Sequence, residues 1–304
     1  MSKTPVGCVF RAVACMAALL SMASAIAQTH GAGANPYPAP AAALSAQYAA
    51  LKDRLGQTSF RRPLQLESRE GKDTVSGEIH AVVDHSFATT GAALSTPSQW
   101  CDILILHLNT KYCRPSADSG STTLHVVIGT KFDTPILEGH RVDFVYRIAA
   151  RTTDYLQVNL EAGEGPLGTH DLRIAVAAMP ADDGKTFVRL SYSYGYGAVA
   201  RLAMQAYLRT IGRDKVGFTV VGKEVDGEPH FVDGVRGVVE RNTMRYYLAI
   251  EAFLGALSAP PQARLAKSLG DWFTATEGYP RQLREVERGE YLEMKRKEYA
   301  RQQG

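Results

Sequence analysis

One pair of adjacent residues, Asp84-His85, joins a carboxylate to a candidate base. Held together in space, these two groups could do general acid–base chemistry or activate a serine. The pair falls in a predicted strand, 74–87, where neighbouring side chains point to opposite faces, so the two cannot pair directly. The sequence also contains no Gly-x-Ser-x-Gly and no His-Glu-x-x-His. We therefore predict no catalytic residue and no metal ligand from sequence motifs.

Two glycine-rich stretches resemble the fingerprint that binds dinucleotide phosphates. The first, Gly163 to Gly168, lies between two predicted strands and contains Pro166, which is typical of a hairpin turn. The second, Gly195 to Ala200, follows a strand and opens a predicted helix. That strand alternates serine with tyrosine, unlike the wholly apolar strand of a buried parallel sheet. We expect no cofactor.

Aromatic side chains gather on one face of two predicted strands. Tyr192, Tyr194 and Tyr196 share a face, as do Phe144 and Tyr146 on their own strand. Phenol groups on an apolar wall could orient the polar end of a ligand. Packing between aromatic rings on neighbouring strands would explain the same pattern.

A long predicted helix, 239–257, carries arginines at its start and apolar residues around most of its circumference. Arg241 and Arg245 lie one turn apart, which suits recognition of an anionic head group. The alternative is an ion-pair network with Glu240 that holds the helix to a sheet. Because the helix must face more than one apolar surface, a ligand could supply one of them; a filled core is the alternative.

The remaining elements follow from periodicity. Alternation with period two, interrupted by turn residues, predicts an antiparallel meander over 74–87, 122–130, 141–151, 155–162, 171–179 and 185–196. One further strand is expected at 216–221. Helices are predicted at 41–55, within 88–108 as one or two short helices, and at 198–211, 239–257, 262–276 and 281–302.

A strand, a helical pair, a meander and a long apolar helix form the element order of the helix-grip fold. With the stretches Trp100-Cys101-Asp102-Ile103-Leu104 and Glu240 to Tyr247, the segment 74–258 resembles the START-like, polyketide-cyclase-like (SRPBCC) superfamily, as an exported bacterial member. The resemblance implies an α+β fold whose curved antiparallel sheet wraps around the long C-terminal helix. It also implies an apolar cavity for a lipid, sterol or polyketide. The two later cysteines and the extra C-terminal helices, 259–304, depart from this pattern.

These observations together predict a binding protein for a hydrophobic or amphipathic small molecule, such as a lipid, held between sheet and long helix. Two alternatives stay open: a cyclase or hydratase in the same cavity, and an envelope protein that binds a partner through 259–304. The predicted ligand contacts are Trp100, Phe144, Tyr146, Tyr192, Tyr194, Arg241, Arg245, Tyr247 and Leu254.

The first 27 residues have the order of a secretory signal peptide. Lys3 and Arg11 both precede an apolar run, and small residues follow this run. We therefore expect cleavage before Gln28 and a periplasmic or secreted protein. Residues 28–40 are rich in Gly, Ala and Pro and are predicted to be a linker, followed by a helix and extension at 41–73. Removing two cations lowers the net charge from +3 to +1, which argues against nucleic-acid binding.

Two cysteines remain after the predicted cleavage, Cys101 and Cys113. An even number in an exported chain favours a disulfide. Two buried free thiols are the alternative.

Overall fold

The computed structural model describes residues 40–118, 120–198, 201–202, 204 and 215–304, all within one compact unit, Pro38–Gly304. The predicted signal peptide, nearly all of the linker and most of the predicted helix at 198–211 lie outside the described residues. Within the described part of the chain, no helix is both long and apolar enough to span a bilayer.

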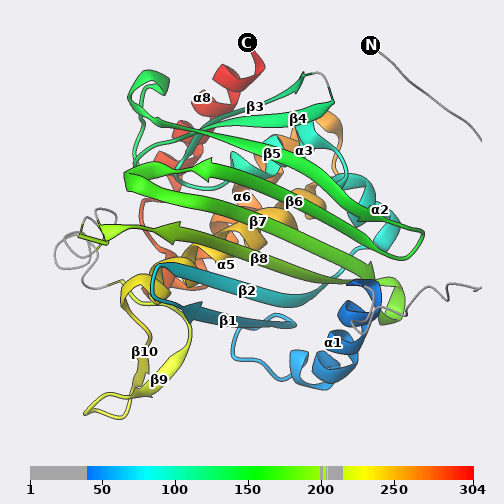
Figure 1. The fold of residues 1–304 in the computed structure, drawn as a ribbon, viewed down its shortest axis with the longest axis vertical. Helices are drawn as coiled ribbons and strands as arrows, with labels where there is room; N and C mark the ends of the chain where they lie inside the picture. The colour runs from blue at the N-terminus through cyan, green and yellow to red at the C-terminus, as the bar shows by residue number, and fades with distance from the viewer. Residues whose placement is uncertain (1–39, 119, 199–200, 203, 205–214) are drawn as a thin grey trace, which may run out of the picture. The chain divides into compact units, whose positions relative to one another are not determined.

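One eight-stranded sheet forms the centre of the unit (Figure 1). Its strands are β1 (Leu64–Glu70), β2 (Thr74–Val83), β3 (Thr110–Asp118), β4 (Ser121–Ile128), β5 (His140–Arg151), β6 (Leu156–Glu164), β7 (Thr169–Pro180) and β8 (Thr186–Tyr196). They lie in the order β1-β2-β8-β7-β6-β5-β4-β3, and every neighbouring pair is antiparallel. The predicted meander is therefore confirmed.

The two edge strands, β1 and β3, were not predicted. Only Leu64 is fully buried in β1, so its sequence lacks a strong alternation. In β3, Pro115 interrupts the pattern. Proline cannot donate to a ladder and is tolerated at a sheet edge, where one side of the strand has no partner. Edge strands thus carry a weaker sequence signal than the central ones.

Strand β2 ends earlier than predicted, and this changes the setting of Asp84-His85. The pair lies in the bend between β2 and the next helix rather than in a strand, and Asp84 forms an ion pair with Lys185 at 3.6 Å.

The sheet topology shows where the two glycine-rich stretches lie. The first contains the turn between β6 and β7, and the second follows a strand with antiparallel neighbours on both sides, which is not a dinucleotide-binding unit.

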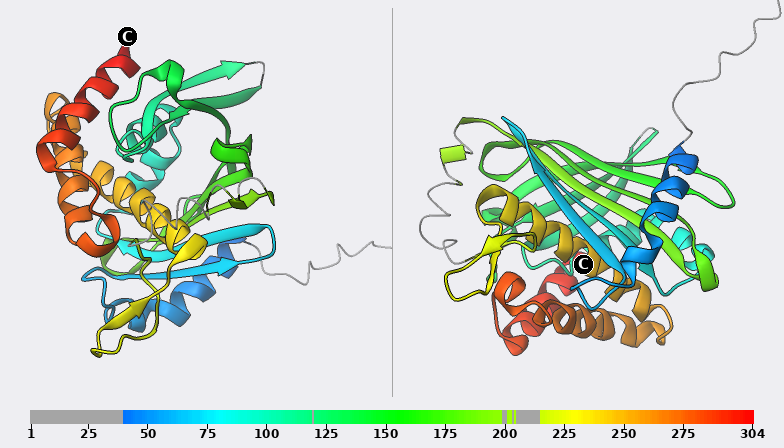
Figure 2. Two further views of the ribbon diagram at one scale, coloured as in Figure 1. Left: turned by 90° about the vertical axis from the view of Figure 1, so that its left-hand side faces the viewer. Right: turned by 90° about the horizontal axis from the view of Figure 1, so that it is seen from below.

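Helices cover the inner face of the curved sheet (Figure 2). The longest is α5 (Gly234–Ala256), which packs on β1, β2 and β8 and begins five residues before the predicted start. After it come α6 (Pro261–Glu277), the short α7 (Pro280–Leu283) and α8 (Arg288–Gln303). The predicted last helix is thus divided by the segment after Leu283. This arrangement confirms the predicted helix-grip fold, in which a curved antiparallel sheet wraps around a long C-terminal helix.

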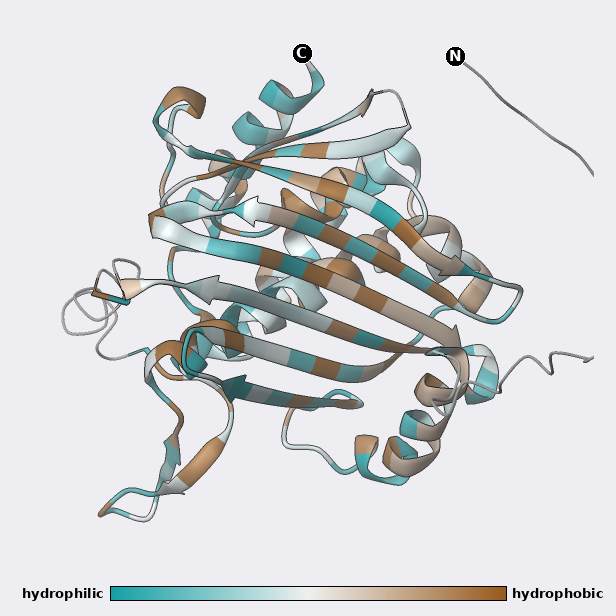
Figure 3. Ribbon diagram, in the orientation of Figure 1, coloured by the Kyte–Doolittle hydropathy of each residue, from teal (hydrophilic) through white to brown (hydrophobic). Residues whose placement is uncertain are grey.

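Alternation along the strands decides which residues face the helices (Figure 3). In β2, Val75, Ile79 and Val83 are buried in the main core. Burying a side chain of this size stabilises the folded state by about 1.5–3 kcal/mol. On the opposite face, α1 (Pro40–Leu55) adds Leu44 and Leu55 to a second apolar cluster. The sheet therefore has a large inner core and a smaller outer one.

Close contact between α5 and the sheet depends on small and polar residues at its N-terminal half. A Cβ at Gly77 of β2 would collide with the side chain of Thr243, so glycine lets the helix approach the strand. The buried carboxylate of Glu240 accepts hydrogen bonds from the backbone N–H of Phe218 at 2.6 Å and from Ser68 Oγ at 2.6 Å. These contacts anchor α5 to β1 and to the chain before it.

Two short helices, α2 (Phe87–Leu94) and α3 (Pro97–Leu104), connect β2 to β3. Cys101 of α3 is bonded to Cys113 of β3, with Cα atoms 5.1 Å apart. The predicted disulfide is thus present, and closing a loop of this length stabilises by about 3 kcal/mol in the chain-entropy model.

The C-terminal helices belong to the same core. Trp272 of α6 stacks on Tyr291 of α8 with ring centroids 4.9 Å apart, and both are buried in the main core. Their large apolar side chains are therefore packed within the domain.

A two-stranded hairpin, β9 (Val220–Lys223) and β10 (Pro229–Phe231), lies close to the predicted strand at 216–221.

Candidate ligand cavity

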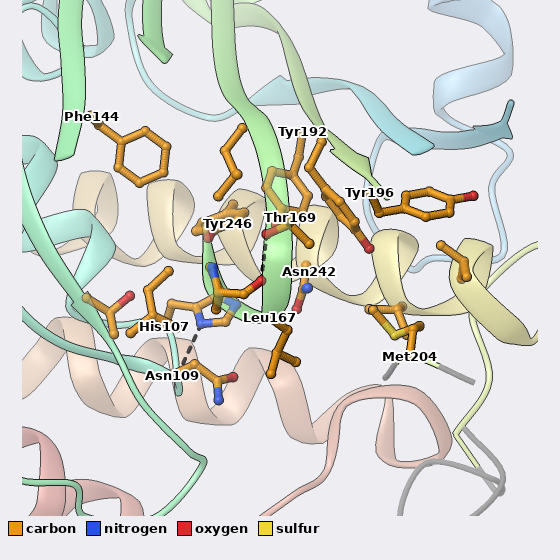
Figure 4. A pocket seen from close by; sticks show the side chains of 17 residues that line it. His107, Asn109, Phe144, Leu167, Thr169, Tyr192, Tyr196, Met204, Asn242 and Tyr246 are labelled. Atoms are coloured by element: carbon orange, nitrogen blue, oxygen red, sulfur yellow. Dashed lines mark hydrogen bonds between the residues drawn. The ribbon is translucent and has the colours of Figure 1, made fainter. Parts of the chain in front are cut away.

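A cavity of about 160 Å³ lies between the sheet and α5 (Figure 4). Its walls come from β4, β5, β7 and β8, from α5, from the segment before β3 and from the turn before β7. The residues that line it are His107, Asn109, Thr110, Ile128, Phe144, Pro166, Leu167, Thr169, Leu172, Tyr192, Tyr194, Tyr196, Met204, Val235, Val238, Asn242 and Tyr246.

Helix α5 presents one stripe to this space. Val235, Val238, Asn242 and Tyr246 follow one another at intervals of three and four residues, so they lie on one face of the helix. The lower part of the stripe is apolar, and its last two members carry an amide and a phenol. The helix thus supplies both an apolar surface and hydrogen-bonding groups.

A row of rings runs along the cavity. His107 stacks on Tyr246 at 4.8 Å between centroids, and Tyr246 meets Tyr192 edge to face at 5.2 Å. Tyr192 contacts Tyr194 at 5.6 Å, and Tyr194 contacts Tyr196 at 6.3 Å. The aromatic rings predicted on β8 pack along their own strand and against α5, and they line the cavity; orientation of a ligand by their phenols stays a prediction.

Two buried polar atoms on the cavity wall have no hydrogen-bond partner among the described residues. They are Nε2 of His107 and Oη of Tyr194, in side chains that are each 5% exposed. Leaving a buried polar group unpaired costs about 1–3 kcal/mol, so native structures seldom do so without a reason. A ligand that hydrogen-bonds to them would remove this cost.

Electrostatics make the wall neutral. Burial lowers the pKa of His107 well below its usual value, and the positive charges of Arg245 and Lys295 lower it further, so the imidazole is uncharged at neutral pH. Burial raises the pKa of Tyr194 and Tyr246, whose phenols stay protonated. None of the described lining residues is an aspartate, glutamate, lysine or arginine.

Behind this wall, a fully buried charge cluster holds the backbone. We call Lys111, Lys295 and Glu298 the lysine cluster; all three side chains are inaccessible to solvent. Lys295 Nζ donates to the carbonyls of His107 and Thr110 and to Glu298, each at 2.7 Å. Lys111 Nζ donates to the same glutamate at 2.9 Å. Helix α8 thereby fixes the segment that presents His107 to the cavity.

Three of the predicted ligand contacts lie at the cavity: Phe144, Tyr192 and Tyr194. Trp100 and Tyr146 are buried elsewhere and both donate to the carbonyl of Leu94, at 2.7 and 3.3 Å. They join α3 and β5 to the end of α2. The structure therefore gives them a packing role, and any contact with a ligand remains a prediction.

The predicted contacts on α5 are also not among the described residues that line the cavity. Arg241 donates to the carbonyl of Val216 at 3.3 Å, and Arg245 pairs with Glu285 at 3.0 Å. Tyr247 donates to Glu251 at 2.7 Å, and Leu254 is buried in the core. Recognition of an anionic head group by the arginines stays a prediction, and the contacts seen here hold the helix to its neighbours.

Sequence reasoning missed His107, Asn242 and Tyr246 as cavity residues. His107 is the one polar residue in the apolar run Ile103 to Leu108, which is a signal that could have found it. Asn242 and Tyr246 stand four apart on the long helix, and continuing that spacing to Val238 would have outlined the stripe.

A row of three hydrogen-bonded polar side chains lies on the outer face of the sheet, away from the cavity. Ser116 Oγ is 2.8 Å from His125 Nε2, and His125 Nδ1 is 2.7 Å from Asp143 Oδ1. This order matches a catalytic triad, but Arg141 Nε donates to the same carboxylate oxygen at 2.9 Å, and Asp143 is about half exposed. Because the carboxylate is shared and solvated, we interpret the group as a surface hydrogen-bond network.

No family model and no curated protein matches this sequence. Among solved structures, the human StAR-related lipid transfer protein 5 matches with a TM-score of 0.30 and 10% identity, over 57% of this chain and 92% of its own. A protein from Nitrosospira multiformis gives 0.28 and 16%, over 50% and 89%. A conserved protein of unknown function from Enterococcus faecalis gives 0.33 and 8%, over 74% and 95%. TM-scores of this size carry no argument about a ligand, and the fold assignment rests on the topology above.

Proposed function

We propose that this chain binds a small amphipathic molecule in the cavity between the sheet and α5. The observation that carries the proposal is the pair of buried, unpartnered polar atoms, His107 Nε2 and Tyr194 Oη, on a wall that is otherwise apolar or aromatic. Binding sites typically combine an apolar lining with a few placed polar groups.

Cavity size limits the ligand. At about 160 Å³, the space is close to that of engineered cavities of about 150 Å³ that hold a benzene molecule. A ring-sized body or a short chain therefore fits inside it. Such a group, alone or as one end of a larger amphipathic molecule, is the part of the ligand that the cavity would hold.

We also propose that the protein acts outside the cytoplasm. The disulfide between Cys101 and Cys113 is compatible with an oxidising compartment, and the first 27 residues have signal-peptide order. N-terminal sequencing of the exported protein tests this. Cleavage before Gln28 is the expected result, and a retained Met1 in the mature protein would contradict it.

The binding proposal is tested by native mass spectrometry of the protein purified from its own compartment, followed by extraction of any bound molecule. Val238→Phe places a ring on the cavity side of α5, and Val145→Phe makes the same change on the exposed outer face of β5. We expect a bound small molecule in the wild type and in Val145→Phe, and its loss in Val238→Phe. A bare mass in all three, unchanged by added small-ring compounds, would contradict the proposal.

A further inference from the structure

We infer that the ligand presents an uncharged carbonyl oxygen to His107, which donates a hydrogen bond to it from Nε2. The inference rests on the proposed function and names the chemical class that the same cavity selects. Three features of the described residues carry it: the tautomer of His107, the rigidity of its position and the charge around it.

The tautomer follows from the one hydrogen bond that the ring makes. The backbone N–H of Asn109 donates to Nδ1 of His107 at 3.2 Å (Figure 4). A neutral imidazole has one acceptor nitrogen and one N–H, so the proton is on Nε2. That N–H is buried at the cavity and has no hydrogen bond of normal geometry among the described residues, so an acceptor on a ligand would satisfy it. The side chain of Asn242 lies close enough to raise the pKa of His107 as a hydrogen-bond partner would, but no hydrogen bond of normal geometry joins it to Nε2.

The position of this donor is set before any ligand arrives. Lys295 holds the carbonyls of His107 and Thr110, so the backbone on both sides of Asn109 is fixed. The ring itself stacks on Tyr246. A donor held in place loses little conformational entropy on binding, which strengthens discrimination between ligands.

Charge decides which acceptor fits. Arg245, Lys295 and Lys111 act on His107 with positive charge. This charge is partly offset by Glu298 beside the lysines and by Glu285 beside Arg245. A cationic ligand would be repelled. An anionic ligand would meet no charged partner among the described lining residues and would lose its hydration, which is costly. An uncharged carbonyl oxygen avoids both costs, and Tyr194 Oη offers a second hydrogen bond within the same cavity.

The test compares four six-membered-ring probes by titration calorimetry at pH 6.5: cyclohexanone, methylenecyclohexane, cyclohexylammonium and cyclohexanecarboxylate. Methylenecyclohexane replaces the ketone oxygen with a CH₂ group of similar shape. We expect the ketone to bind roughly three- to tenfold more tightly than methylenecyclohexane, the range that one net hydrogen bond supplies. We expect no measurable binding of the two ions.

Two variants assign the effect to His107. In His107→Asn the side-chain oxygen can replace Nδ1 as acceptor, but the Nε2 donor is lost, so the preference for the ketone should fall to about onefold. His107→Gln keeps a donor near the Nε2 position and should retain part of the preference. His125→Asn, on the outer face, is the matched control and should leave the preference unchanged. The ratio of two affinities is read in each variant, so a general change in cavity size or stability does not mimic the result.

Equal binding of ketone and methylenecyclohexane to the wild type would overturn the inference while leaving a binding protein. Tightest binding of either ion would overturn it too. A ketone preference that survives in His107→Asn would remove His107 from the site. If no probe binds and the purified protein also shows a bare mass, the proposed function itself fails; if no probe binds but a molecule co-purifies, a molecule without a carbonyl oxygen would overturn the inference alone.

Discussion

The two sides of the segment His107 to Thr110 differ sharply in how their polar groups are satisfied. On the side facing α8, the lysine cluster saturates the backbone carbonyls with hydrogen bonds and excludes water completely. On the cavity side, His107 Nε2 and, across the cavity, Tyr194 Oη are equally buried and unpartnered. The same segment thus has hydrogen-bonded backbone carbonyls on the side of α8 and, among the described residues, an unpartnered side-chain nitrogen on the side of the cavity.

This contrast separates support from recognition. A buried polar network that is fully satisfied rigidifies the segment it holds. A buried polar atom left without a partner favours whatever molecule can complete it. The stability of the domain should therefore depend on the lysine cluster, and its ligand preference on the cavity atoms.

The largest effect should come from breaking the lysine cluster. Glu298→Ala leaves Lys111 and Lys295 buried without their shared carboxylate, and removing one partner of a buried ion pair typically costs about 3–5 kcal/mol. Urea unfolding at pH 6, below the folded-state pKa of Lys295 of about 7, measures the change. Glu293→Ala removes an exposed partner of Lys297 on the same helix and should leave stability nearly unchanged. Equal losses in the two variants would contradict the distinction.

A pH dependence should follow from the same cluster. Burial lowers the pKa of Lys295 to about 7, whereas the unfolded chain keeps the ordinary pKa near 10.5. Between pH 7 and 9 the unfolded state therefore binds more protons, and the free energy of unfolding rises with pH by at most about 1.4 kcal/mol per pH unit. Burial lowers the pKa of Lys111 as well, and it contributes with the same sign. Lys295→Met should flatten the profile measured by urea unfolding over this range; an unchanged slope would contradict the assignment.

The smallest effect should distinguish a cavity hydroxyl from a core hydroxyl. Tyr194→Phe removes an oxygen that has no hydrogen-bond partner among the described residues, so the unliganded protein should lose no stability. Tyr291→Phe removes a hydroxyl that donates to the carbonyl of Leu106 at 2.8 Å and should cost about 1 kcal/mol or somewhat more. Thermal unfolding of both variants without ligand measures the difference. A larger loss for Tyr194→Phe would mean that its hydroxyl already has a partner.

Much of the fold could be predicted because its signals are local. The alternation in the central strands, the apolar circumference of α5 and the turn residues between strands each lie within one short window of sequence. The edge strands β1 and β3 were not predicted, because apolar and polar residues alternate only weakly in β1 and Pro115 interrupts the pattern in β3. The start of α5 at Gly234 was not predicted, because the first turns of the helix lie partly exposed and precede its apolar run.

By itself, the sequence determined the order of elements, the antiparallel meander, the cysteine pair and the aromatic face of β8, since each depends on residues close together in the chain. Only the tertiary structure decided which polar groups meet. Lys295 reaches the carbonyl of His107 across 188 positions, and that contact leaves no trace in any local pattern. Whether a buried histidine is satisfied or waits for a ligand depends on such distant partners, because a hydrogen bond requires atoms within about 3 Å, whatever their separation along the chain.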